Sequence, residues 1–143
     1  KVEGAFSDLE GHHVQFTPSQ TAQFYGKILT HNHPSGSSLS DADVALAVSH
    51  GVKEIRAVGV HRDVTYRYRL TFDDPELGSA SDAYMIHNNA TGSMMEEYRP
   101  LVISGRLSQQ DAWFDHSHRA MQVVARVLTE RGTPAPYSRE KLP

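Results

Sequence analysis

Two histidines and an aspartate that lie close together in the sequence are the residues best suited to chemistry. His31 and His33 are separated by one residue, and in an extended segment this spacing puts both side chains on the same face. Asp43 follows after a short polar loop, at the start of an expected helix that could fold back onto the histidines. Two imidazoles and one carboxylate suit zinc and leave a fourth position open for water, as a catalytic site requires. The pattern therefore predicts a zinc site formed by these three residues.

The composition limits which side chains could bind a metal and which kinds of partner the protein could have. The chain of 143 residues contains nine histidines and no cysteine, so imidazole and carboxylate groups must hold any transition metal. The formal net charge is -3, and the nearest approach to a basic patch is the sparse set of Arg62, Arg67 and Arg69. Nucleic acid is therefore not a favoured partner. No apolar run approaches the ~20 residues that a membrane-spanning helix needs, so no membrane partner is expected.

The elements that must position these residues are short. A buried strand over residues 27–30 is expected to lead into a loop over 31–39, and Ser40 is expected to cap a helix over 41–50 that Gly51 ends. The acidic residues that follow Ser40 are favoured at that place by the helix dipole. The other expected elements are strands over 54–60 and 64–72 joined by a turn at 61–63, short helices over 81–87 and 94–102 with a break between them, and a long helix over 108–131.

The chain length fits a single domain spanning residues 1–143. Because the chain begins at Lys1 rather than at a methionine, we expect this domain to belong to a longer protein. The sequence leaves its localisation open between a secreted or delivered effector domain and a cytoplasmic protein.

The stretch from Thr30 to Val44 resembles the JAMM signature of the JAB/MPN metallopeptidases, in which H-x-H-P is followed by a short loop and S-x-x-D. The residues that match this signature are His31, Asn32, His33, Pro34, Ser40 and Asp43. The HNHPSG string is similar to the form found in bacterial branches of the family, including RadC-like proteins. The chain is also similar to JAB-like domains of bacterial polymorphic toxins and of phage head-associated proteins.

This resemblance implies an α/β fold with a small mixed β-sheet packed by helices, an MPN/JAB-like (cytidine-deaminase-like) core, with a long C-terminal helix added. It implies that the two histidines and Asp43 bind zinc, that a glutamate acts as general base and that Ser40 stabilises the oxyanion. Glu3 is the first candidate for the base, because Glu-Gly in an early strand is similar to the family's E-x-x-G. Glu10 is the second candidate, and a glutamate before Lys1 is the third.

The function implied is zinc-dependent hydrolysis of a peptide or isopeptide bond in a protein or peptide substrate. The toxin-like resemblance adds an effector role and an immunity protein as a partner. A non-catalytic JAMM-like protein-binding module is an alternative, because the region before His31 is short and the glutamate base has more than one candidate position. Taken alone, Ser40 and Asp43 are also typical of a helix cap. A toxin domain that hydrolyses a nucleotide or nucleic acid is another alternative, which the net charge disfavours.

Overall fold

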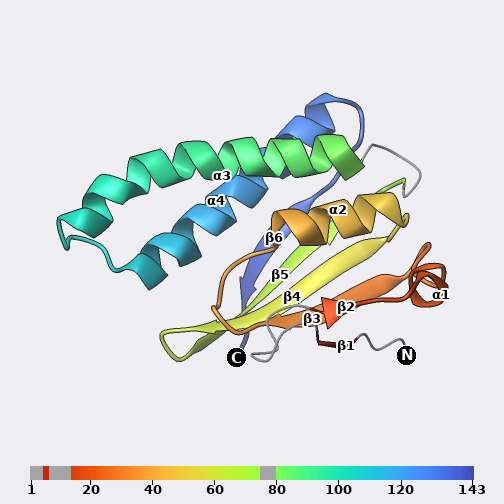
Figure 1. Ribbon diagram of the computed structural model, residues 1–143, viewed down its shortest axis with the longest axis horizontal. Coiled ribbons are helices and arrows are strands. Elements are labelled where there is room, and N and C mark those ends of the chain that lie inside the picture. Colours follow the sequence, from red (N-terminus) through yellow and green to blue (C-terminus); the bar gives the residue numbers. More distant parts are fainter. Residues whose placement is uncertain (1–4, 7–13, 75–79) are drawn as a thin grey trace.

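The structure is a computed structural model that describes residues 5–6, 14–74 and 80–143 (Figure 1). Its elements are, in chain order, β1 (Ala5–Phe6), β2 (Val14–Gln15), α1 (Pro18–Thr21), β3 (Ile28–His33), α2 (Asp41–Ser49), β4 (Glu54–His61), β5 (Val64–Thr71), α3 (Ala80–Ile103), α4 (Gln109–Glu130) and β6 (Tyr137–Lys141). Strands β3, β4, β5 and β6 form one sheet in that order, and β1 and β2 form a separate two-stranded sheet.

The four-stranded sheet is mixed. β3 runs parallel to β4, while β4 and β5, and β5 and β6, are antiparallel. Helices α2, α3 and α4 gather over the sheet, and α3 packs along both α2 and α4 (Figure 1). The predicted α/β class, with a small mixed sheet packed by helices, is therefore confirmed. The long helix near the C-terminus is also confirmed, and Ser108 caps it as expected.

The core lies between one face of the sheet and these three helices. Its most deeply buried side chains are Phe24, Leu39, Val44, Ala47, Val52, Ile55, Ala57, Tyr68, Leu70, Met121 and Val124. The alternation predicted for residues 64–72 is confirmed, because Tyr68 and Leu70 point into the core, whereas Arg67 pairs with Glu140 of β6. Full burial of a Val or Leu side chain contributes roughly 1.5–3 kcal/mol to the stability of the fold. Burial of Val44 and Ala47 in this core therefore holds α2 against the sheet.

Strand β3 is longer than the sequence predicts. A loop is expected over residues 31–39, but the strand continues to His33 because its pairing with β4 continues up to Gly59. The chain then turns at Gly36, whose φ of 73° favours glycine. A Cβ at Gly36 would lie 2.4 Å from the carbonyl oxygen of Val60, so the turn packs directly on β4. Both histidines of the motif therefore lie on a strand rather than in a loop.

Helix α3 is one continuous helix over residues 80–103, so the prediction of two short helices is wrong. The break expected between these two helices, over residues 88–92, rests on the asparagines and the glycine of this stretch, which have weak helix propensity. Packing against α2 and α4 overrides that propensity and buries Ala83, Ala90 and Tyr98. In the part of the chain that the structure describes, no helix is long and apolar enough to cross a membrane.

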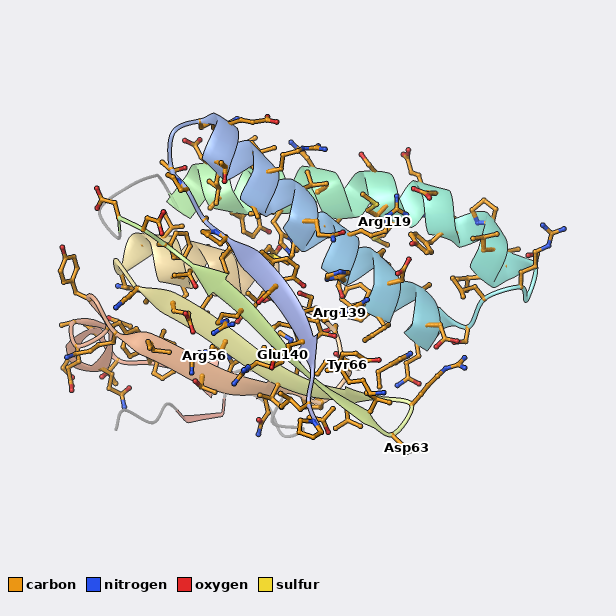
Figure 2. All side chains as sticks on the ribbon, turned by 180° about the vertical axis from the view of Figure 1, so that it is seen from behind. Arg56, Asp63, Tyr66, Arg119, Arg139 and Glu140 are labelled. Carbon is orange, nitrogen blue, oxygen red and sulfur yellow. The ribbon has the colours of Figure 1, made fainter. Side chains whose placement is uncertain are left out.

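Strand β6 has no signal in the local sequence pattern. Residues 137–141 pair with β5, which would otherwise expose the unpaired backbone groups of an edge strand. Arg139 of β6 lies beside Tyr66 of β5 (Figure 2). Its guanidinium carbon is 5.6 Å from the ring centroid of Tyr66 and 4.6 Å from that of Phe114. These cation–π contacts join β6 to β5 and α4.

Candidate metal centre

Three polar side chains meet where β3 ends and α2 begins. His31 and His33 lie on the less exposed face of β3, and Asp43 lies in the first turn of α2. The Nε2 atom of His31 is 3.0 Å from Oδ1 of Asp43, and the Nε2 atom of His33 is 3.1 Å from Oδ2. The two Nε2 atoms are 2.8 Å apart. The structure thus brings together the three side chains that the sequence spacing singles out.

The position of Asp43 follows from the way in which α2 begins. The Ser40 hydroxyl accepts a hydrogen bond of 3.1 Å from the backbone N–H of Asp43. The Asp43 carboxylate in turn accepts one of 2.7 Å from the backbone N–H of Ser40 through Oδ2. This reciprocal capping box satisfies N–H groups that a helix start leaves unpaired. The capping box therefore fixes the carboxylate that faces the histidines.

A backbone carbonyl determines which ring nitrogen of His33 faces the site. Nδ1 of His33 lies 3.0 Å from the carbonyl oxygen of Ser37. Because a carbonyl oxygen can only accept, Nδ1 carries the hydrogen, and in the neutral ring the lone pair is on Nε2. Metal-binding histidines commonly make this second contact, since it fixes the tautomer and the orientation of the ring.

The site is partly open to solvent. The side chains of His33 and Asp43 are 14% and 16% exposed, whereas that of His31 is 30% exposed. An ion or a substrate group can therefore reach the three ligands from the side of the site where His31 lies.

Hydrogen bonds join the imidazoles of His31 and His33 to the carboxylate of Asp43. Burial disfavours the charged form of Asp43, but hydrogen bonds from His31 and His33 outweigh it and lower the pKa of Asp43 below its ordinary value. Burial also disfavours protonated His33, but its hydrogen bond to Asp43 and the carboxylate charge raise the pKa of His33 above its ordinary value. A metal cation can take the place of these shared protons.

The donor set fits a metal ion. The candidate ligand atoms of His31, His33 and Asp43 all lie within 4.8 Å of one another. Two imidazoles and a carboxylate suit zinc, and they also suit other divalent first-row metals. Within the described part of the chain, this group of three contains no glutamate.

The sequence offers two glutamates of this chain as candidates for the general base. Glu3 and Glu10 both lie outside the described residues. Glu54 starts β4 next to Ile28, at the opposite end of β3 from His33. It is held there by Arg56 and Thr71.

The turn between β3 and α2 is held by side chains that sequence reasoning missed. The Tyr68 hydroxyl donates a hydrogen bond of 2.7 Å to the carbonyl oxygen of Gly36. Nε2 of the buried His87 lies 3.1 Å from the carbonyl oxygen of Leu39 and donates to it. These contacts join β5 and α3 to the turn, and no local sequence signal predicts them.

Comparison of the chain with models of known families, with curated proteins and with solved structures found no match in any of the three.

Proposed function

We propose that this protein is a zinc-dependent hydrolase of the JAMM type that cleaves a peptide or isopeptide bond. The observation that carries the proposal is the convergence of His31, His33 and Asp43, with the lone pair of His33 directed to the site by the carbonyl of Ser37. The order of these residues, with Ser40 capping the helix that carries Asp43, is that of the JAMM signature.

When bound, zinc would supply a Lewis acid that polarises the scissile carbonyl and lowers the pKa of water. The chain supplies the rest. His31, His33 and Asp43 would hold the ion, and the capping box keeps the carboxylate in place. The Ser40 oxygen accepts from Asp43 N–H, so its own hydroxyl hydrogen can donate to a developing oxyanion at the N-terminus of α2.

A hydrolysis assay tests this proposal. Zinc-loaded protein is incubated with an isopeptide-linked ubiquitin-like conjugate and with a mixture of unstructured peptides, and products are identified by mass spectrometry. We expect cleavage that stops with a chelator, returns with zinc and is absent in His33→Ala. Asp111→Asn, which alters a histidine–aspartate contact outside the site, serves as the control and should cleave. Cleavage that persists in His33→Ala would contradict the proposal.

The general base is assigned by two further variants. Glu3→Gln and Glu10→Gln each remove a carboxylate without removing a proposed metal ligand. The variant that lacks the base should lose turnover by roughly 10²–10⁴-fold while it retains zinc. Wild-type turnover in both variants would exclude both residues.

A non-catalytic JAMM-like protein-binding module is the second candidate. It is supported by the absence of a glutamate from the three-residue group within the described residues. A module would give no turnover, and its partner binding would be unchanged in His33→Ala. A partner captured equally by the wild type and by His33→Ala, with no product formed, would favour the module.

The effector role is tested in cells. We expect expression of the domain in bacteria to slow growth, and His31→Ala to abolish this effect because it removes a ligand. Equal growth inhibition by the wild type and by His31→Ala would contradict a metal-dependent toxin.

A further inference from the structure

The peptide bond between Ser37 and Ser38 connects the candidate metal centre to helix α4. Its carbonyl oxygen, that of Ser37, accepts the hydrogen bond of 3.0 Å from Nδ1 of His33. Its N–H, that of Ser38, donates a hydrogen bond of 3.0 Å to the hydroxyl oxygen of Ser117. Because a peptide unit is planar and rigid, the bond at one end fixes the orientation of the group at the other.

Ser117 reaches this peptide from a distant part of the chain. It lies in α4, 79 residues after Ser38, and it is only 7% exposed. Its hydroxyl also makes a long hydrogen bond of 3.4 Å to the carbonyl oxygen of Phe114, one turn earlier in the same helix. The hydroxyl hydrogen is thus directed along α4, and a lone pair of the oxygen faces the N–H of Ser38.

A second contact holds Ser38 from the other side. Its hydroxyl lies 2.6 Å from the hydroxyl of Tyr137 in β6. The Tyr137 hydroxyl in turn lies 2.8 Å from Nδ1 of His118 in α4. Ser38 is buried, so neither its N–H nor its hydroxyl can exchange these partners freely for water.

We propose that Ser117 is a positioning residue of the metal centre, acting through the 37–38 peptide on the ring of His33. The inference rests on the proposed function to the extent that His33 binds the metal. Ser117 keeps the carbonyl of Ser37 aimed at Nδ1 of His33, and this holds the hydrogen on Nδ1 and the lone pair on Nε2.

Removal of the Ser117 hydroxyl leaves the buried N–H of Ser38 without its acceptor, which is unfavourable. The peptide then turns towards another acceptor and takes the carbonyl of Ser37 away from His33. Loss of a partner behind a metal-binding histidine typically lowers metal affinity by about 10–100-fold. We therefore expect Ser117→Ala to weaken zinc binding by about tenfold or more.

The experiment compares Ser117→Ala with Thr133→Val. Thr133 lies after the far end of α4, and its hydroxyl donates a bond of 2.7 Å to the carbonyl of Leu128. Ser117→Ala removes a hydroxyl that takes part in two hydrogen bonds, and Thr133→Val removes a hydroxyl that makes one, so both variants should unfold at lower temperature. Only Ser117→Ala should lower zinc affinity, change the visible spectrum of bound Co²⁺ and shift the ¹⁵N signal of His33 Nδ1 in the zinc-loaded protein.

Tyr137→Phe provides a second variant that keeps the aromatic ring. It loosens Ser38 from the side of β6 and should change the same three readouts in the same direction by a smaller amount. The inference is overturned if Ser117→Ala and Tyr137→Phe bind zinc and Co²⁺ as the wild type does and keep its ¹⁵N signal of His33 Nδ1 in the zinc-loaded protein. Absence of metal binding in the wild type would instead refute the proposed metal centre, and the inference with it.

Discussion

Two neighbouring strands of the sheet each end on a histidine that faces an aspartate at the start of a helix. His33 of β3 faces Asp43, and His61 of β4 faces Asp111, with Nε2 of His61 2.9 Å from Oδ1. Asp111, like Asp43, lies three residues after a capping serine, and its N–H donates to the hydroxyl of Ser108. The two strand ends share the same local arrangement, yet among the described residues only the first belongs to a group of three side chains that could hold a metal ion.

The first difference lies two residues before each histidine. β3 has His31 at that position, which supplies a second imidazole to the site. β4 has Gly59, where a Cβ would lie 2.8 Å from Cα of Gly36. No side chain fits at Gly59 because the turn after β3 packs against it. The close packing of Gly36 on Gly59 therefore leaves no room for a second ligand side chain beside His61 and Asp111.

The second difference is the partner of the carboxylate. Arg62 donates to both carboxylate oxygens of Asp111, which neutralises its charge. The ring of His61 is stacked on Phe114, with centroids 4.0 Å apart and an interplanar angle of 5°. This contact joins the β4–β5 hairpin to α4. A strand-end histidine that faces a capping aspartate is thus a structural contact at His61. At His33, the second imidazole and a carboxylate without an arginine partner make a group that could hold a metal ion.

The largest effect is expected from removal of a ligand. His33→Ala and Asp43→Ala should each lower zinc affinity by more than about 100-fold, because even the loss of an outer partner of a ligand costs about 10–100-fold. His61→Ala should retain zinc and lose about 1–3 kcal/mol of stability instead. Competition with a chromophoric chelator measures the affinities. Stoichiometric zinc in both His33→Ala and Asp43→Ala would contradict the claim that the His33–Asp43 pair binds a metal whereas the His61–Asp111 pair does not.

Gly59→Ala tests the close packing of Gly59 on Gly36, which distinguishes the His61–Asp111 contact from the candidate metal centre. The new methyl group would collide with the backbone at Gly36, and we expect a loss of about 1–3 kcal/mol of unfolding free energy, together with weaker zinc binding. Gly92→Ala is the matched control, because a Cβ there has open space within a helix, where alanine is favoured. Chemical denaturation of the two metal-free variants measures the unfolding free energies, and competition with a chromophoric chelator measures the zinc affinities. Wild-type stability in Gly59→Ala would contradict the packing described.

The pH dependence of zinc binding should show the effect of the Asp43 carboxylate on His33. Asp43 raises the pKa of His33, and a protonated imidazole cannot bind a metal. Zinc affinity should therefore fall as the pH decreases through this raised pKa, by about tenfold per pH unit for each proton displaced. Zinc titrations over a pH series measure the slope. Affinity that stays constant below the ordinary histidine pKa would argue against His33 as a ligand.

The smallest effect is expected at the second aspartate. Asp111→Asn weakens the contacts with Arg62 and His61, so the midpoint of thermal unfolding should decrease slightly. Zinc content should be unchanged. Calorimetry and elemental analysis of the same sample measure both, and loss of zinc in this variant would show that the two places are coupled.

Local patterns predicted the part of the site that depends on local geometry. The spacing of His31 and His33 gives a shared face on any extended segment, and Ser40 positions Asp43 through bonds between residues three apart. The alternation over 64–72 likewise indicated a strand with one buried face. These features need no knowledge of the rest of the chain.

Features that depend on distant partners could not be predicted. Helix α3 continues through residues 88–92 because α2 and α4 pack against it, and β6 forms because β5 offers a free edge. Ser117 is a single small polar residue on a buried helix face, and nothing nearby in the sequence distinguishes it. Its role depends on an N–H that lies 79 residues away.

The most direct test of the metal centre is elemental analysis of the purified wild type beside the His31→Ala/His33→Ala double variant. The arrangement of ligands at the end of β3 predicts about one zinc ion per chain in the wild type and none in the double variant. A wild type that takes up no zinc even after supplementation, or a double variant that retains it, would contradict the assignment of these residues as a metal centre.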